Sequence, residues 1–179
     1  MTPFPAGLSK AWVPIALSRE LKTRPLARKL ADVPLVLFRS GDGVTVLKDR
    51  CPHRNFPLSE GKVRDGAIEC PYHGWRFDGA GRCVDVPGAG ESTDFAKLGA
   101  ERIAVAEQHG AVFIRLEGGE NAPAFEPPPL IGDPKYDHFW YSRGVWRGRP
   151  LDALENAHAA AAVTSRPSPF KVAGKAHAA

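Results

Sequence analysis

Two short segments, each with one cysteine and one histidine, carry the chemistry that this chain could perform. His53 follows Cys51 at the second position, His73 follows Cys70 at the third, and sixteen residues separate His53 from Cys70. Each segment can therefore present one thiolate and one imidazole from a single loop. Proteins use these side chains to bind zinc, iron and iron–sulfur clusters. The sequence predicts a metal centre with two sulfur and two nitrogen ligands.

The order of the residues within each segment favours an iron–sulfur cluster over zinc. Zinc sites usually group two cysteines in one segment and two histidines in another, whereas each segment here mixes the two types. Replacing two cysteine ligands of a [2Fe–2S] cluster by histidines raises its reduction potential from about −400 mV to about −150 to +300 mV. A structural zinc ion, which accepts the same side chains, is the alternative.

The segments Cys51-Pro-His-Arg54 and Cys70-Pro-Tyr-His-Gly-Trp75 resemble the Rieske domain of bacterial non-haem iron oxygenases. The resemblance implies a Rieske [2Fe–2S] cluster, with Cys51 and Cys70 on the inner iron and His53 and His73 on the outer one. It also implies a set of residues that surround the cluster without ligating it: Arg54, Tyr72, Gly74 and Trp75.

A comparison with the Rieske proteins of respiratory cytochrome-bc complexes indicates the potential of the cluster. The two ligand loops of those proteins have sequences similar to Cys-Thr-His-Leu-Gly-Cys and Cys-Pro-Cys-His-Gly-Ser. The extra cysteines form a disulfide between the loops, and the serine hydroxyl donates a hydrogen bond to a sulfur. The matching positions here are Phe56, Tyr72 and Trp75. A cluster without these features is expected at the low end of the Rieske range, suited to electrons from a flavin or ferredoxin reductase.

Short β-rich runs must position the two loops. The predicted strands are Trp12–Ala16, Pro34–Phe38, Val44–Lys48, Ala67–Glu69, Trp75–Phe77, Cys83–Val86, Ile103–Glu107 and Ala111–Leu116. Turn signals separate them at Gly41-Asp42-Gly43, Asp65-Gly66, Asp78-Gly79 and His109-Gly110. Ser18–Arg28 is expected to be a short helix or an extended loop, and Glu91–Ala100 a loop with one helical turn. This pattern predicts an all-β fold, an antiparallel β-sandwich or barrel. The resemblance to Rieske domains implies the Rieske type of this fold, an antiparallel β-sandwich with two cluster-binding hairpin loops, here with a short C-terminal extension.

Three segments are predicted along the chain. Residues 1–119 form the Rieske [2Fe–2S] domain, residues 120–135 a Pro-rich linker, and residues 136–179 the start of an oxygenase catalytic domain followed by an Ala-rich, disordered tail. Alternating residues around Phe139-Trp140-Tyr141 indicate a strand in the third segment.

The resembled oxygenases continue into a catalytic domain whose ferrous iron is bound by a helix of the form Glu-Asn-x-x-Asp-x-x-His-x-x-x-x-His. Glu155-Asn156 matches its start, but the aspartate and the two histidines are replaced by Ala159, Ala162 and Pro167. Mononuclear Fe(II) is therefore expected only in an intact homologue, and this chain alone is not expected to hydroxylate or demethylate. The abrupt end of the pattern suggests a prematurely ended or out-of-frame oxygenase remnant; a short protein with its own tail is the alternative.

Composition limits the other classes of function. The net charge of +4, with 43% apolar and 25% charged residues, is too weakly basic to imply nucleic acid. Basic residues do gather near the ligand loops, where they form either a solvated surface or a docking face for an acidic redox partner: Arg54, Lys62, Arg64 and Arg76.

Cys83, the third cysteine, is expected to be a half-buried strand residue and not a ligand. The N-terminus shows no secretory or membrane-spanning segment, which predicts a cytoplasmic protein without a membrane partner.

The predicted function is electron transfer by the N-terminal part of an oxygenase component that acts on aromatic or similar ring compounds. The expected partners are a flavin or ferredoxin reductase as electron donor and an oxygenase catalytic domain or subunit. A stand-alone Rieske ferredoxin is the alternative, and a zinc-stabilised interaction domain without redox chemistry is less favoured.

Overall fold

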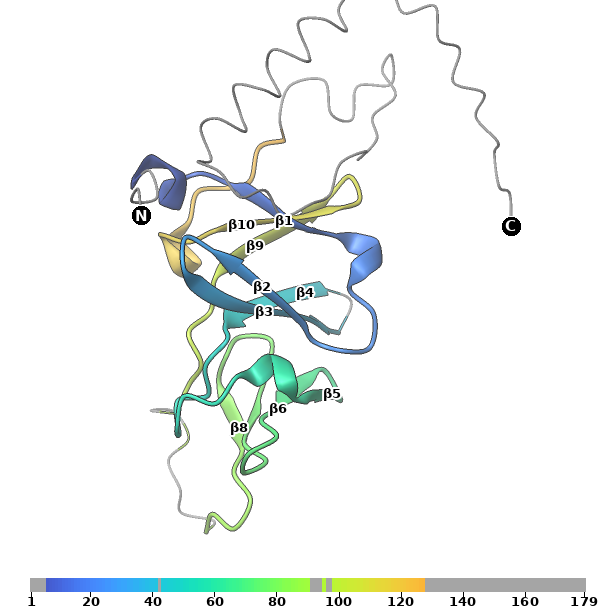
Figure 1. The fold of residues 1–179 in the computed structure, drawn as a ribbon, viewed down its shortest axis with the longest axis vertical. Coiled ribbons are helices and arrows are strands. Elements are labelled where there is room, and N and C mark those ends of the chain that lie inside the picture. The colour runs from blue at the N-terminus through green and yellow to red at the C-terminus, as the bar shows by residue number, and fades with distance from the viewer. Residues whose placement is uncertain (1–5, 42, 91–94, 96–97, 128–179) are drawn as a thin grey trace, which may run out of the picture. The chain divides into compact units, whose positions relative to one another are not determined.

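Short antiparallel strands are the main secondary structure in the computed structural model of this chain, which describes residues 6–41, 43–90, 95 and 98–127 (Figure 1). The helical elements among these residues are single 3₁₀ turns: η1 (Ala6–Lys10), η2 (Ser18–Glu20), η3 (Leu58–Glu60) and η5 (Gly119–Asn121). The prediction of an all-β, antiparallel fold is confirmed. None of the helices described is long and apolar enough to cross a membrane.

The strands of the described residues form three sheets. The first has the order β1 (Val13–Leu17), β10 (Ala111–Arg115), β9 (Ala104–Gln108). The central sheet has the order β2 (Leu26–Leu30), β3 (Val33–Ser40), β4 (Gly43–Lys48). The third has the order β5 (Lys62–Arg64), β6 (Ala67–Glu69), β7 (Arg76–Phe77), β8 (Cys83–Asp85). In Figure 1 the central sheet lies between β1, β9 and β10 on one side and the third sheet on the other.

Strand β3 explains this arrangement, because it buries both of its faces. Successive side chains of a strand point to opposite faces. Leu35 and Leu37 belong to a hydrophobic core shared with the first sheet, whereas Val36 and Phe38 belong to a core shared with the third sheet. All four side chains are 0% exposed. An unbroken apolar run in an antiparallel strand is therefore explained by burial on both sides.

The core between the central and third sheets contains the cysteines of both candidate ligand segments. Its buried members are Val36, Phe38, Leu47, Cys51, Leu58, Ile68, Cys70, Phe77, Cys83 and Ala100. The prediction that Cys83 lies on a strand is confirmed, but its side chain is only 5% exposed and more buried than expected. Cys83 is buried because it is the one residue of β8 that faces this core.

Within the residues that the structure describes, all eight predicted strands are present, with ends that differ by at most two residues from the prediction. Two strands of this part of the chain were missed. β2 begins at Leu26, inside the segment predicted as a helix or loop, and the helical part of that segment is only η2. In β2 the inward positions are Leu26, Arg28 and Leu30, so an arginine interrupts the apolar alternation. β5 has Val63 as its single apolar residue.

Several predictions fall outside the described residues. These are the strand around Phe139, the Glu155-Asn156 segment, the rest of residues 136–179, and most of Glu91–Ala100. The Pro-rich segment is described only through Pro127. Within it, the ring of Phe125 packs against two other rings. Its centroid lies 4.4 Å from that of Phe113 and 5.5 Å from that of Trp12.

Candidate metal centre

Two loops with the same backbone hydrogen bonds carry the four candidate ligands. Loop 1 (residues 51–56) lies between β4 and η3, and loop 2 (residues 70–75) joins β6 to β7. In each loop the cysteine N–H donates to the carbonyl five positions later, which is Phe56 for Cys51 and Trp75 for Cys70, both at 2.8 Å. The cysteine carbonyl in turn accepts from the N–H four positions later, at 2.7 Å in loop 1 and 2.9 Å in loop 2.

The fourth position after each cysteine has a left-handed backbone. It is Asn55 in loop 1, with φ of 57°, and Gly74 in loop 2, with φ of 75°. Asparagine tolerates this conformation better than most residues, and glycine adopts it at no steric cost. A Cβ atom on Gly74 would also lie 2.9 Å from Cγ of Pro87. Loop 2 therefore needs glycine for two reasons.

The two thiols form the buried part of the site. Cys51 and Cys70 are each 2% exposed, and their thiols are close enough to hydrogen-bond. Burial raises the pKa of Cys51 to about 11; the backbone N–H groups of His53 and Arg54 oppose the rise, and Cys70 adds to it. Two neighbouring buried thiols resist ionisation unless a cation compensates their charge, which is the situation of thiolates bound to a metal.

The two imidazoles form the exposed part of the site. The rings of His53 and His73 lie 4.7 Å apart, and Trp75 stacks on His53 at 4.7 Å with nearly parallel planes. Desolvation lowers the pKa of His53, and the charges of His73 and Arg54 lower it further. The neutral imidazole that results is the form that binds metals. Tyr72 lies 4.0 Å from His73, between ring centroids.

The structure brings the four predicted ligand residues together as a thiol pair and an imidazole pair. In the part of the chain that the structure describes, no three His, Cys, Asp or Glu side chains are grouped so that they could hold one metal ion. Two separate pairs suit a two-iron cluster, which takes sulfur ligands at one iron and nitrogen ligands at the other. The residues present therefore fit a [2Fe–2S] cluster.

The residues predicted to surround the cluster lie in loops 1 and 2. Tyr72 and Trp75 contact the histidines, Gly74 shapes loop 2, and the charge of Arg54 acts on His53. The ring of Phe56 lies 5.4 Å from that of Tyr72 and joins the two loops at the surface.

Sequence reasoning missed a carboxylate that fastens loop 1. Asp49, only 9% exposed, accepts hydrogen bonds from the backbone N–H of Ser59 at 2.7 Å and from its hydroxyl at 2.5 Å. The backbone N–H of Asp49 donates to Pro34 O in β3 at 2.9 Å. Asp49 and Ser59 stand on either side of loop 1, so this pair closes the loop and ties it to the central sheet. No spacing rule in the sequence signals the pair.

Two of the four basic residues near the loops are neutralised. Lys62 forms an ion pair with Glu69 at 2.9 Å, across the β5–β6 ladder, and Arg76 forms one with Asp65 at 3.4 Å. Arg54 and Arg64 are exposed and form no ion pair with any residue that the structure describes.

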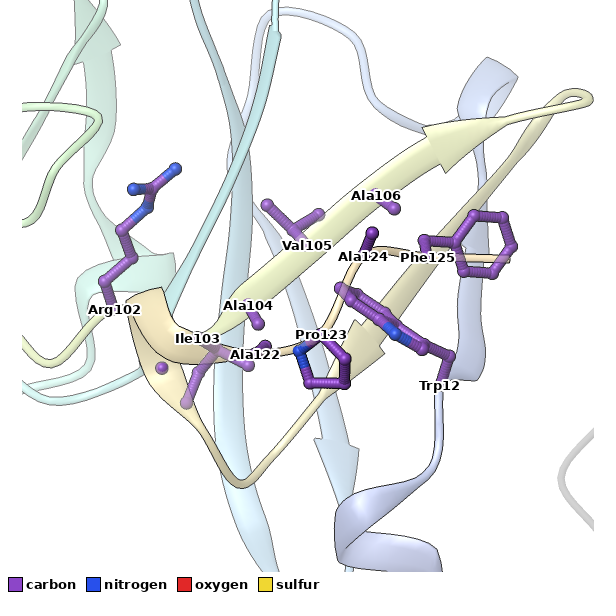
Figure 2. Close-up of a pocket in the computed structure, with 11 residues that line it drawn as sticks. Trp12, Arg102, Ile103, Ala104, Val105, Ala106, Ala122, Pro123, Ala124 and Phe125 are labelled. Atoms are coloured by element: carbon purple, nitrogen blue, oxygen red, sulfur yellow. The ribbon is translucent and has the colours of Figure 1, made fainter. Parts of the chain in front are cut away.

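A cavity of about 260 Å³ lies apart from the loops, against β9 and residues 119–125 (Figure 2). Trp12, Pro123 and Phe125 line it, and Arg102 is the one ionisable residue in its lining. Figure 2 shows the Arg102 side chain pointing away from the aromatic rings. This cavity therefore lacks the groups for catalysis or metal binding, and the chemistry of the described residues is concentrated in loops 1 and 2.

Comparisons with known proteins identify the family of this domain. Residues 11–113 match the family model described as the Rieske [2Fe-2S] domain. The chain is 41% identical over 124 residues to the oxygenase component of dicamba O-demethylase from Stenotrophomonas maltophilia, covering 69% of this chain and 35% of the relative. It is 37% identical over 130 residues to methylxanthine N1-demethylase NdmA from Pseudomonas putida, covering 69% of this chain and 37% of the relative.

Solved structures show the same likeness in three dimensions. Dicamba monooxygenase bound to dicamba superposes with a TM-score of 0.65 at 39% identity, over 72% of this chain and 39% of the other. The chain thus spans little more than a third of the length of these relatives. Because the family model covers more than half of its residues, this chain belongs to the Rieske [2Fe–2S] domain family, and its cofactor is a [2Fe–2S] cluster.

Proposed function

We propose that Cys51 and Cys70 bind one iron of the cluster, that His53 and His73 bind the other, and that the chain transfers single electrons through it. The observation that carries this proposal is the pairing of two buried thiols with two exposed imidazoles on matching loops. Buried sulfurs keep water from the cluster, while imidazoles at the surface let a redox partner approach.

The electron transfer is proposed to serve an oxygenase component that acts on aromatic or similar ring compounds. Support comes from the names of the relatives, which include a dicamba O-demethylase and an aminopyrrolnitrin oxygenase. We propose a flavin or ferredoxin reductase as the donor, because the relatives include components of multi-part systems. The division into residues 1–119, 120–135 and 136–179 is part of this proposal, with a catalytic domain or subunit receiving the electron. With Cys51 and Cys70 assigned to the cluster, only Cys83 remains, so the cysteines provide no disulfide framework, and we propose a reducing, cytoplasmic location.

Anaerobic reconstitution of the full chain with iron and sulfide tests the ligand assignment. We expect a reddish-brown protein with two irons and two sulfides per chain and, after reduction with dithionite, the EPR signal of a reduced Rieske cluster. Cys51→Ser and Cys70→Ser should each abolish this signal. Cys83→Ser is the matched control, because Cys83 is also buried but lies on β8, outside both loops.

Two results would contradict the proposal. One is a colourless, EPR-silent protein that contains zinc. The other is a Cys83→Ser variant that loses the cluster while Cys51→Ser retains it.

A further inference from the structure

Two exposed aromatic rings adjoin the histidine side of the site. Among the described residues, three large hydrophobic side chains are exposed: Phe56 at 37%, Tyr72 at 52% and Val84 at 47%. Phe56 comes from loop 1 and Tyr72 from loop 2, and their ring centroids are 5.4 Å apart. Single exposed apolar residues are ordinary, but a contiguous aromatic pair beside a functional site indicates a contact surface.

The charge next to these rings is positive. Arg54 is exposed, follows His53 directly, and forms no ion pair with another described residue. The carboxylates of Glu69 and Asp65, on the neighbouring β5–β6 hairpin, are compensated by Lys62 and Arg76. The surface formed by Phe56, Tyr72 and Arg54, here called the docking face, therefore combines aromatic area with a free positive charge. Since the whole chain is also positive, at +4, charge favours an acidic partner over a second copy.

The docking face also adjoins the exposed histidines. The ring of Tyr72 is 4.0 Å from that of His73, whose ring is 4.7 Å from that of His53. A protein seated on Phe56 and Tyr72 would bring its own redox centre close to the imidazoles.

We propose that the docking face binds an electron-donor protein whose redox centre is surrounded by acidic residues and an apolar contact patch. This inference rests on the proposed function. One electron leaves the donor and one enters the cluster, and no bond is formed or broken. The aromatic rings supply contact area at the centre of the interface, and Arg54 steers and orients the acidic partner.

The test follows reduction of the reconstituted full chain by an acidic plant-type [2Fe–2S] ferredoxin, used as the probe because its potential is low enough to donate. Stopped-flow absorption gives the second-order rate constant at low and at high ionic strength. Tyr72→Ala, Phe56→Ala and Arg54→Glu should each lower this constant by about tenfold at low salt. Arg54→Glu keeps the backbone N–H beside Cys51 and should also flatten the salt dependence.

Two variants serve as matched controls. Val84→Ala removes the third exposed hydrophobic side chain, which lies on β8, outside the docking face. Arg24→Glu reverses an exposed arginine in the segment before β2. Both should keep the wild-type rate constant to within about twofold.

Reduction by dithionite separates this inference from the proposed function. If wild type and variants all form the cluster and react with dithionite, yet ferredoxin reduces them at equal rates, the docking face is wrong. A wild-type chain that never forms the cluster contradicts the proposed function instead. If the aromatic variants do not form the cluster, the Arg54→Glu variant still tests the docking face. A wild-type rate constant and an unchanged salt dependence in Arg54→Glu would then overturn the proposal. If sedimentation shows a wild-type dimer that Tyr72→Ala dissociates, the face is a contact between copies and the proposal is overturned.

Discussion

Each candidate ligand lies in surroundings that suit its chemical type. The cysteines are buried in the core beneath the loops, and the histidines stand at the surface against Trp75 and Tyr72. The formal charges of two ferric irons, two sulfides and two thiolates sum to zero, whereas four thiolates would leave a charge of minus two. A less negative cluster accepts an electron more readily, so each imidazole raises the potential.

Replacing one imidazole by a thiolate should reverse that effect. We expect His73→Cys to retain a cluster with a reduction potential lower by on the order of 100 mV or more, toward the values of all-cysteine clusters. An EPR-monitored redox titration measures the shift. His109→Cys, on the β9–β10 turn, makes the same substitution away from both loops and should leave the potential unchanged. An unchanged potential in His73→Cys would contradict the assignment of this ligand.

The need for glycine at position 74 can be separated into backbone and steric parts. Gly74 and Gly88 have nearly equal φ angles, 75° and 78°. A Cβ on Gly74 would lie 2.9 Å from Cγ of Pro87, whereas a Cβ on Gly88 would meet nothing within 4 Å beyond its own chain neighbours. Both alanine variants should lose roughly 1–2 kcal/mol from the left-handed backbone. Gly74→Ala should lose more and bind less iron, as measured by denaturant unfolding and iron content. Equal losses in both variants would show that the contact with Pro87 has no effect.

At the scale of the elements, loop 1 depends on groups outside itself. Asp49 precedes Cys51 by two positions, and Ser59 belongs to η3 beyond the loop. Between them Leu58 is 0% exposed and anchors the same turn in the core. The position of Cys51 and His53 is therefore set by a buried carboxylate and a buried leucine. Neither residue is a candidate ligand.

Removing this carboxylate should loosen loop 1. We expect Asp49→Ala to destabilise the protein by about 1–3 kcal/mol, because the Ser59 N–H and hydroxyl lose their acceptor, and to speed the loss of iron to a chelator. Ser59→Ala, which keeps the backbone N–H, should have a smaller effect. Asp32→Asn removes an exposed carboxylate, paired with Lys29, and is the control, because asparagine tolerates the left-handed backbone at this position. Iron release from Asp49→Ala at the rate of the control would contradict this role.

The sequence predicted most strands because their apolar residues alternate or cluster between turn residues. β2 was not predicted because Arg28 takes an inward position and interrupts the apolar alternation. There its charge is compensated by Glu20 at 2.7 Å, and its Nε donates to Ile15 O at 3.2 Å. Periodicity cannot reveal a charge that is paired with a residue eight positions away. The neutralisation of Lys62 and Arg76 was hidden for the same reason, since it depends on strand register and loop contacts.

The candidate ligands could be predicted because two cysteines and two histidines at a characteristic spacing define the donor set. The docking face could not, because it requires Phe56 and Tyr72 from different loops to meet at the surface. The Asp49–Ser59 pair likewise exists only after the chain turns back across loop 1.

At the scale of the whole domain, an ion pair joins the first and central sheets. Arg39 in β3 donates to both carboxylate oxygens of Glu107 in β9, at 2.6 and 2.8 Å. The hydrogen bond from Arg39 lowers the pKa of Glu107 below its ordinary value of 4.5, against the opposing effect of burial. A carboxyl group whose pKa is lower in the folded than in the unfolded state stabilises the fold above the unfolded value and loses that contribution as the pH falls.

The ion pair therefore predicts a pH-dependent difference between wild type and Glu107→Gln. Above about pH 6 the variant should be less stable by roughly 1 kcal/mol, and the difference should shrink once the pH falls below 4.5 and vanish below the lowered pKa of Glu107. Denaturant unfolding at a series of pH values measures it. Glu101→Gln removes the more exposed pair with Lys48 and should show little difference. A Glu107→Gln deficit that stays constant down to pH 3 would exclude the ion pair as its cause.

The two ligand loops leave from different sheets, and this has a consequence for how the protein survives in a cell. Loop 1 continues from β4, while loop 2 lies within a sheet whose strands are only two or three residues long. Four bonds to iron, as proposed, would link the third sheet to the central sheet, whose strands are longer. Iron starvation or oxidative damage would then remove this link together with the redox centre. The third sheet would be the first part of the domain to unfold and to be cut by proteases. Loss of iron would then shorten the lifetime of the protein as well as end the proposed electron transfer.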